Sequence, residues 1–517
     1  MKRKTWIVSA LMYALVFLVC FGVLHVLKTL MEPSGPVSVE SRESGGPEGT
    51  REAKTGEEWE ELAGPALATD SQAQEPQDEV IRQEGYKEWK KKFPGMWTPP
   101  QAPEEPYIPP RLILATDLHY QSALAGDGGE AFRLFVERSD GKVVQYLPEL
   151  LEAFLDEVIE ERPSALVLSG DITMNGERLN HEELAARLKR VQDAGIQVLV
   201  IPGNHDINNH DASVYYGARK EPAPYIDGPE FHEIYHEYGY DQALSRDDSS
   251  LSYVYALDDR NWLLMLDSCQ YEPDNKVEGR LKDSTMSWAD EQLARAKEEG
   301  VFVIPIAHHN LLAQSRMYTT QCAMDNNKEV ISLLQKYELP LFFSGHLHVQ
   351  HFMRNNDIGI YEVVTSSLST PPCQYGVLDY MEDETFYYYS RKVDMEKWAR
   401  KNKSTDENLL NFDTYSPPVL KRIFYNQAYD AMKNSAEEET GSVFVKLTES
   451  EKQQMAKVYG DINAACYAGR AYEVVKEAVK QPGYAMWKEY CYPAILYEYL
   501  EYIIEDAVRD YNVLSME

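Results

Sequence analysis

Short apolar runs that stop abruptly at polar residues recur along the middle of the chain. Residues 198–206 read VLVIPGNHD, in which a continuous aliphatic run ends at Pro-Gly and is followed by an amide, an imidazole and a carboxylate. A continuous apolar run of this length is typical of a parallel strand that is buried on both faces. In open α/β sheets, ligands bind at the carboxyl ends of such strands. The pattern therefore predicts a buried strand with a functional site at its end.

Four further segments show the same pattern of an apolar run that ends in polar residues. They are residues 111–119 (RLILATDLH), 165–171 (ALVLSGD), 301–309 (VFVIPIAHH) and 341–348 (LFFSGHLH). Carboxylates, amides and imidazoles bind divalent metals, and side-chain packing does not explain why they follow five separate strands. We expect these strand ends to meet in one metal site.

Helical patterns separate the first strands. Residues 146–160 and 181–194 carry apolar positions at helical spacing, which favours βαβ units and an α/β fold. Apolar runs from residue 251 to about residue 390 predict a second, more antiparallel sheet that packs on the first. From about residue 394 the strand patterns stop. Helical spacing there predicts a C-terminal helical bundle over residues 419–432, 448–477 and 492–511.

Tyrosines are frequent in this predicted bundle. They could stack on a nucleobase or form part of the core with their hydroxyls at its rim. The tyrosines concerned are Tyr484, Tyr490, Tyr492, Tyr497, Tyr499 and Tyr502.

The start of the chain has a different character. Residues 5–27 contain no Asp, Glu, Lys or Arg and, at about 1.5 Å per residue, can span a hydrocarbon core of ~30 Å. The basic start MKRK predicts a single-pass membrane helix whose amino end is cytoplasmic, with the rest of the chain outside. A cleaved signal peptide and a lipoprotein lipidated at Cys20 are the alternatives. Residues 32–106 are rich in Glu, Gly, Pro and Ser and are predicted to form a disordered acidic stalk.

The overall charge limits the possible partners. The formal net charge of -33, from 84 acidic and 51 basic residues, opposes binding to nucleic acid polymers. A small anionic substrate therefore needs local positive charge. The six cysteines show no CxxC spacing, so the sequence indicates neither a zinc knuckle nor a disulfide framework. We predict no protein partner.

The order of the polar motifs, D-x-H, GD, GNHD, H and GH-x-H, resembles that of the calcineurin-like metallophosphoesterases. The resemblance implies a β-sandwich flanked by helices and a centre of two divalent ions, Mn, Fe or Zn. Two carboxylates against two dications would leave a net charge of about +2, which attracts phosphate. One ion would be held by Asp117, His119, Asp171 and His348, and the other by Asp171, Asn204, His308 and His346.

Three residues that closely follow predicted ligands in the sequence are candidates for further roles. His205 is the histidine of the motifs that the metal pattern does not need, so we expect it to protonate or hydrogen-bond the leaving oxygen. Asp206 would orient the ring of His205. His309 would contact the substrate or, alternatively, satisfy a backbone carbonyl.

Longer segments narrow the resemblance. LSGDITMNGE, VIPGNHDINN, HHNLL and the helical tail look like those of the extracytoplasmic cyclic nucleotide phosphodiesterases of Gram-positive bacteria. This implies hydrolysis of small phosphodiesters, with cyclic nucleotides as the expected substrates. A phosphomonoesterase or nucleotidase with the same centre is the alternative. A third, remote hypothesis is a catalytically silent envelope interaction module, which predicts that metal ligands are missing, whereas every ligand position of the pattern is filled here.

The sequence thus predicts a chain of four parts. They are a transmembrane anchor (1–31), the acidic stalk (32–106), a metallophosphoesterase catalytic domain (107–393) and a C-terminal helical domain (394–517).

Overall fold

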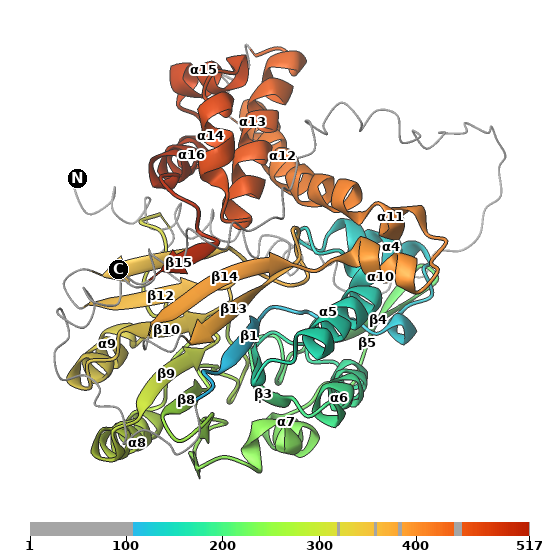
Figure 1. Ribbon diagram of the computed structural model, residues 1–517. Helices are drawn as coiled ribbons and strands as arrows, with labels where there is room; N and C mark the ends of the chain where they lie inside the picture. Colours follow the sequence, from blue (N-terminus) through green and yellow to red (C-terminus); the bar gives the residue numbers. More distant parts are fainter. Residues whose placement is uncertain (1–106, 318–320, 356–358, 381–384, 439–446, 516–517) are drawn as a thin grey trace.

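The computed structural model describes residues 107–317, 321–355, 359–380, 385–438 and 447–515. Two sheets form a sandwich with helices on its outer faces, and a group of helices stands at one end of it (Figure 1). The predicted anchor and stalk lie outside the described residues. Within those ranges, no helix is long and apolar enough to cross a membrane.

The first sheet has six strands and a parallel part that was expected from the sequence. Its strands are β1 (Arg111–Ala115), β2 (Ala165–Ser169), β3 (Gln197–Ile201), β13 (Gln374–Tyr380), β14 (Phe386–Lys392) and β15 (Val513–Ser515). Their order is β15-β14-β13-β1-β2-β3, in which β1, β2 and β3 are parallel and the others antiparallel. The helices α5 (Leu147–Glu161) and α6 (Arg178–Asp193) connect the parallel strands, which confirms the predicted βαβ units.

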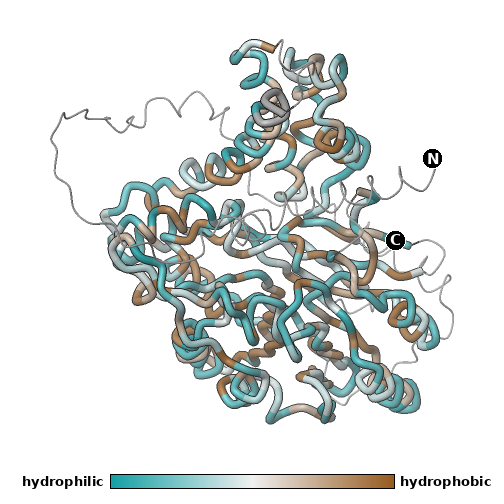
Figure 2. Tube along the Cα trace, turned by 180° about the vertical axis from the view of Figure 1, so that it is seen from behind, coloured by the Kyte–Doolittle hydropathy of each residue, from teal (hydrophilic) through white to brown (hydrophobic). Residues whose placement is uncertain are grey.

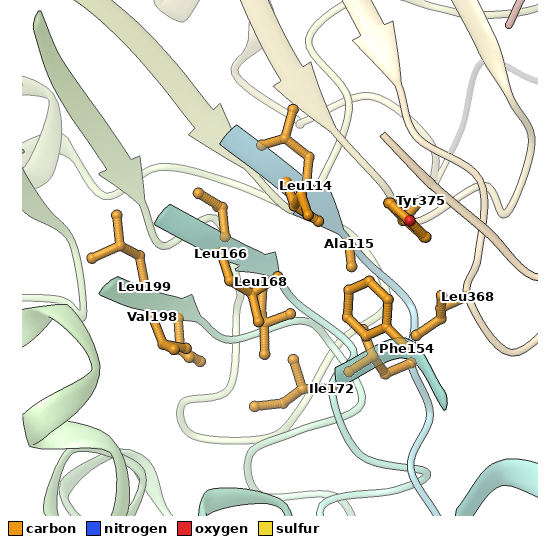
Figure 3. Close-up of a cluster of buried hydrophobic side chains, with 14 of the residues drawn as sticks. Leu114, Ala115, Phe154, Leu166, Leu168, Ile172, Val198, Leu199, Leu368 and Tyr375 are labelled. Carbon is orange, nitrogen blue, oxygen red and sulfur yellow. The ribbon is translucent and has the colours of Figure 1, made fainter. Parts of the chain in front are cut away.

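The parallel strands are apolar because both of their faces are covered. Leu114, Leu166 and Val198 are at most 3% exposed, and Figure 3 shows such side chains from three strands gathered in one cluster. Phe154 of α5 enters this cluster, with its ring centroid 5.1 Å from that of Tyr375 on β13. Helix and strands therefore share one core, in which aliphatic and β-branched residues fit the pleated surface.

The second sheet has seven strands and contradicts one prediction. Its strands are β6 (Ser245–Arg246), β7 (Tyr253–Ala256), β8 (Asn261–Leu266), β9 (Phe302–Ala307), β10 (Leu341–Ser344), β11 (His351–Asn355) and β12 (Ile360–Val364). The order is β11-β12-β10-β9-β8-β7-β6, and the central strands β8, β9, β10 and β12 are parallel. The expectation of a more antiparallel second sheet is therefore wrong. Parallel neighbours need long crossovers, and α8 (Asp283–Glu299) and α9 (Asn327–Lys336) provide two of them.

Short elements line the edge of the first sheet or connect the strands. They are η3 (Ala123–Ala125), α4 (Glu130–Glu137), η4 (Val144–Tyr146), the hairpin of β4 (Ser213–Tyr216) and β5 (Arg219–Pro222), α7 (Gly228–Tyr235) and η5 (His236–Tyr240).

The helical region begins directly after β14. It comprises α10 (Met395–Lys401), α11 (Glu407–Leu410), α12 (Phe412–Glu438), α13 (Glu449–Tyr467), α14 (Ala471–Ala478), α15 (Pro482–Tyr490) and α16 (Ala494–Asp506). The predicted capping box is present, because Thr448 and Glu451 bond reciprocally at the start of α13. The prediction that strands stop at residue 394 is wrong at the very end, where β15 returns to pair with β14.

The core of the helical region extends into the sandwich. The helices have their own cluster of buried residues, and the six tyrosines named above belong to it or pack against it. Of the two roles that the sequence left open for these tyrosines, membership of the core is the one that the structure shows. In Figure 2 many hydrophobic residues lie on the strands, whereas hydrophilic residues are frequent on the outer helices. Leu347, which lies between His346 and His348, also belongs to the helical cluster, so this cluster extends to the turn that carries two of the predicted ligands.

Candidate metal centre

Seven residues with metal-binding side chains meet at the carboxyl ends of five strands. They are Asp117 and His119 after β1, Asp171 after β2, Asn204 after β3, His308 after β9, and His346 and His348 after β10. The structure brings together residues that are far apart in the sequence: Nε2 of His119 lies 3.1 Å from Nε2 of His348. The first sheet provides four of these side chains and the second sheet provides three.

The backbone of these residues is unusual. Positive φ angles, which non-glycine residues rarely adopt, occur at Asp117 (51°), His119 (44°), Asp171 (47°), His346 (71°) and His348 (59°). Such conformations cost on the order of 1–3 kcal/mol each and cluster at functional sites. Hydrogen bonds between the strand ends hold two of them, because the Asp117 N–H donates to the Gly170 carbonyl (3.0 Å) and the His119 N–H to the Asp171 carbonyl (2.9 Å).

Glycines allow the strand ends to approach each other. A Cβ atom on Gly203, which precedes Asn204, would lie 2.1 Å from the Asp171 backbone nitrogen. A Cβ atom on Gly345 would lie 2.0 Å from Oγ1 of Thr116. Any larger residue at either position would therefore push the turns of the GNHD and GH-x-H motifs away from the other ligands.

The first metal position lies between Asp117, His119 and His348. One carboxylate oxygen of Asp117, Oδ2, accepts hydrogen bonds from Thr116 Oγ1 and the His346 N–H, both at 2.9 Å. The other, Oδ1, is buried without a hydrogen-bond partner among the described residues and lies 3.2 Å from Nε2 of His348 and 3.9 Å from Nε2 of His119. An orphaned carboxylate oxygen facing two imidazole nitrogens fits a divalent cation.

Asp171 lies between the two predicted metal positions. Its Oδ2 atom is 3.9 Å from Nε2 of His119 and 3.3 Å from Nε2 of His308. Nε2 of His308 is also 3.2 Å from Oδ1 of Asn204. The other carboxylate oxygen of Asp171 accepts the His205 N–H at 2.7 Å. This placement is the one that a carboxylate shared by two ions requires.

Backbone carbonyls orient two of the histidines. Nδ1 of His308 bonds to the Ser169 carbonyl (3.0 Å), which leaves Nε2 for a metal. Nε2 of His346 bonds to the Gln321 carbonyl (2.7 Å), which leaves Nδ1 for a metal. A hydrogen bond from the second ring nitrogen to a carbonyl is the usual support of a metal-binding histidine.

The pKa values of the site suit metal binding. Burial lowers the pKa of His346 to about 4 and that of His119 well below its ordinary value, so both imidazoles are neutral at pH 7, as ligands must be. Burial lowers the pKa of His308, but the carboxylates of Asp171 and Asp117 and the Ser169 carbonyl together raise it to about 9. A metal binding beside Asp171 would displace this proton.

His205 lies beside the first metal position. Its ring packs edge-on against that of His119, with centroids 4.8 Å apart. Its Nδ1 atom bonds to the Met174 carbonyl (2.9 Å) and to Oδ1 of Asn175 (3.0 Å), so Nε2 is the nitrogen left for a substrate. The prediction that Asp206 orients this ring is wrong.

Asp206 instead joins the turns after β2 and β3. Its fully buried carboxylate accepts hydrogen bonds from the N–H groups of Ile172 (3.2 Å), Thr173 (2.9 Å) and Gly203 (2.8 Å), and from Oγ1 of Thr173 (2.7 Å). Burial and the nearby Asp171 raise the pKa of Asp206 to about 6. Because these donors occupy its oxygens, Asp206 fixes the turns that carry Asp171, Asn204 and His205 and does not bond to the ring of His205.

His309 is held by the protein on both ring nitrogens. Nδ1 bonds to Oγ of Ser268 (2.8 Å) and Nε2 bonds to the Val277 carbonyl (2.9 Å), and the side chain is fully buried. The predicted role in substrate binding is therefore wrong, and the alternative, a satisfied backbone carbonyl, is what the structure shows.

One supporting residue was missed by the sequence analysis. Glu362 on β12 is fully buried and accepts the N–H groups of Leu311 (2.7 Å) and Leu312 (2.6 Å), Oγ of Ser344 (2.7 Å) and Nε2 of Gln314 (2.7 Å). These contacts join the loop after His308 to the end of β10. A single carboxylate in the apolar run IYEVV was the available signal.

Two family models match the chain. Residues 110–350 match the model described as calcineurin-like phosphoesterase, and residues 394–510 match the one described as the C-terminal domain of cyclic nucleotide phosphodiesterase. The chain therefore belongs to the calcineurin-like phosphoesterase superfamily of metal-dependent hydrolases, which confirms the resemblance seen in the sequence.

Single relatives match only in part. The uncharacterized metallophosphoesterase YkuE of Bacillus subtilis (strain 168) is 30% identical over 110 residues, which are 21% of this chain and 38% of that protein. A dimetal phosphatase from Danio rerio is 15% identical, covering 55% of this chain and 97% of its own, with a TM-score of 0.42. A putative 5′-nucleotidase from Staphylococcus aureus is 12% identical, and the match covers 59% of this chain and 57% of that chain, with a TM-score of 0.33.

Proposed function

We propose that the protein is a phosphodiesterase that uses two divalent metal ions to hydrolyse cyclic nucleotides outside the cytoplasmic membrane. The observation that carries the substrate class is the match of residues 394–510 to the C-terminal domain of cyclic nucleotide phosphodiesterase. The convergence of carboxylates, imidazoles and an amide at strand ends of both sheets supports a phosphoesterase centre. The match to the calcineurin-like phosphoesterase model supports the hydrolysis of phosphate esters in general. The match of the helical region supports phosphodiesters as the substrates.

In this proposal each metal position has its own set of ligands. Asp171 belongs to both sets, which is why its carboxylate lies between His119 and His308. Bound Mn, Fe or Zn ions would polarise the phosphoryl group and activate a water molecule. The first set is Asp117, His119, Asp171 and His348, and the second is Asp171, Asn204, His308 and His346.

His205 would serve the leaving group. Its Nδ1 atom is engaged by the Met174 carbonyl, so the protonated ring can donate only through Nε2. Donation of that proton to the leaving alkoxide is general acid catalysis, which contributes typically ~10²- to 10⁴-fold to the rate. Asp206 would support this step indirectly, because it fixes the turn that carries Asn204 and His205.

A substrate screen tests this proposal. Purified protein is stripped with a chelator, restored with Mn²⁺ and assayed on 2′,3′- and 3′,5′-cyclic nucleotides, bis(p-nitrophenyl) phosphate, p-nitrophenyl phosphate and nucleoside monophosphates. We expect hydrolysis of the diesters to depend on the metal and to exceed that of the monoesters. A preference for monoesters would contradict the proposal and indicate a phosphomonoesterase or nucleotidase.

The proposed location rests on the sequence of the first hundred residues. Protease added to intact cells should cleave within residues 32–106 and release a soluble, active fragment. A cytoplasmic enzyme in the same cells should stay intact. Protection of the chain until the cells are lysed would contradict an extracytoplasmic location.

A further inference from the structure

A single peptide group links three parts of the metal centre. The peptide between Asn204 and His205 joins a predicted metal ligand to the predicted proton donor. Its N–H group donates to Oδ1 of Asp171 at 2.7 Å. The other carboxylate oxygen, Oδ2, then faces His119 and His308, at 3.9 Å and 3.3 Å from their Nε2 atoms. The orientation of this peptide therefore influences how Asp171 meets the two ions.

The carbonyl of the same peptide is held by Asn275, which lies in the loop after β8. Nδ2 of Asn275 donates to the Asn204 carbonyl at 2.7 Å and to the Ile207 carbonyl at 2.9 Å. Both bonds end in the turn that carries the GNHD motif. Because the C=O and N–H groups of a peptide lie in one plane, a bond to the carbonyl also fixes the direction of the N–H. Asn275, this peptide and Asp171 thus form a chain of hydrogen bonds in which each bond polarises the next.

The loop that carries Asn275 is fixed on both sides of this residue. Before it, Nδ2 of Asn208 donates to the Tyr271 carbonyl (2.9 Å). After it, Nε2 of His309 bonds to the Val277 carbonyl (2.9 Å). Asn208 follows β3 of the first sheet and His309 follows β9 of the second, so the loop contacts strand ends of both sheets. The half-buried side chain of Asn275 is therefore held in place for its two bonds.

We propose that Asn275 is a positioning residue that sets the carboxylate of Asp171 for two divalent ions through the Asn204–His205 peptide. This inference rests on the proposed function, in that the ions are those of the proposed hydrolysis. Residues that support a metal ligand by a hydrogen bond orient it and tune the affinity for the metal. Without the amide of Asn275, the peptide would no longer be held in the plane that points its N–H group at Asp171.

The test compares Asn275→Leu and Asn275→Gln with the control Asn463→Leu. Leucine has nearly the size of asparagine but no N–H group, whereas glutamine keeps the amide. Nδ2 of Asn463 also donates to a backbone carbonyl, that of Tyr459 (2.8 Å), but within α13. The affinity for Mn²⁺ is measured by calorimetry, and the stability of the metal-free protein is measured by urea unfolding.

Asn275→Leu should bind Mn²⁺ about 10- to 100-fold more weakly than the wild type, the usual effect of removing a residue that supports a metal ligand. Asn275→Gln should retain more of the affinity. Asn463→Leu should bind Mn²⁺ like the wild type, even if its metal-free form is less stable. A loss of stability in metal-free Asn275→Leu with wild-type affinity for Mn²⁺ would show a merely structural role and overturn the proposal.

Mn²⁺ binding is measured without substrate, which separates this inference from the proposed function. If the wild type hydrolyses no diester but Asn275→Leu binds Mn²⁺ more weakly, the substrate proposal fails and the role of Asn275 stands.

If Asn275→Leu does not fold, the wild type answers the question. Coupling between two sites is reciprocal, so Mn²⁺ should slow amide hydrogen exchange in the loop of residues 271–276 as well as in the turn of residues 203–208. Exchange in α13 should stay unchanged. Equal exchange in the loop with and without Mn²⁺ would then overturn the proposal.

Discussion

The two halves of the metal centre differ in charge. The half that follows β1, β2 and β3 contains both carboxylates, Asp117 and Asp171, whereas the half that follows β9 and β10 contains imidazoles alone. Carboxylates attract a dication over a distance, while neutral imidazoles bind it by direct coordination. The comparison suggests that the first sheet captures the ions and the second sheet completes their coordination.

The halves also differ in how the helical region supports them. On the first half, Leu420 of α12 packs against Gly141, which stands two residues before Val143. The Val143 N–H donates to the Ser369 carbonyl (2.9 Å), and Oγ of Ser369 donates to the Asp117 carbonyl (3.0 Å). On the second half, Asp506 of α16 bonds to Nε2 of His351 (3.1 Å), and Nδ1 of His351 bonds to Gln314 (2.8 Å). Gln314 in turn donates to Glu362 (2.7 Å). Packing and hydrogen bonds, such as that from Tyr146 Oη to Asp406 (3.2 Å), join the helical region to the first half, whereas a chain of polar contacts that ends at Glu362 supports the second.

The largest effect is expected when the shared carboxylate of Asp171, in the first half, is removed. Asp171→Asn should reduce kcat/KM by about 10³-fold or more and leave fewer than two ions per chain, because the shared anion is lost. His346→Gln, in the second half, should leave one ion bound more often than none. Asp193→Asn, an exposed carboxylate on α6, is the control and should change neither quantity. Metal analysis after gel filtration, together with kinetics, checks these outcomes. Two ions and near-normal turnover in Asp171→Asn would refute the assignment.

A smaller effect concerns His205, which lies in the first half but is not needed as a ligand. His205→Ala should keep both ions and lose ~10²- to 10⁴-fold in kcat for a cyclic nucleotide, whose alkoxide leaving group needs a proton. The loss should be distinctly smaller for bis(p-nitrophenyl) phosphate, because p-nitrophenolate leaves without protonation. The comparison of kcat on the two substrates is the measurement. Equal losses on both would show that His205 orients the phosphate instead.

The smallest effect concerns the polar support of the second half. Burial raises the pKa of Glu362 from its ordinary 4.5 to about 7. Between these pH values, the chain therefore takes up a proton at Glu362 when it folds. The contribution of Glu362 to the free energy of unfolding is fully present below pH 4.5 and is lost as the pH rises through 7. The wild type should therefore lose up to roughly 3 kcal/mol of unfolding free energy relative to Glu362→Gln between pH 5 and pH 8. Urea unfolding of both proteins checks this, and parallel pH profiles would contradict it.

Much of the predicted ligand set could be read from the sequence, because each ligand stands in a local pattern. Each predicted ligand stands one to four residues after an apolar strand, and apolar strands with both faces covered are recognisable as continuous runs. The helices α5 and α6 and the capping box of α13 were predictable for the same reason.

The supporting contacts were not predictable, because they join residues that are distant in sequence. Glu362 reaches Leu311 and Leu312, and Asp506 reaches His351 across 155 residues. No local pattern specifies which buried donor a carboxylate will meet. The role of Asp206 was misassigned for this reason, since all of its donors except Gly203 lie on the neighbouring strand end, at Ile172 and Thr173.

The central claim is that the two sheets hold two ions through one shared carboxylate. The most direct test is a crystal structure of the Mn²⁺-loaded protein with anomalous diffraction recorded for manganese. We expect two anomalous peaks about 3.5–4 Å apart, with Asp171 in contact with both and with Asp117 and His308 on opposite ions. A single peak, or two peaks without Asp171 between them, would contradict the account.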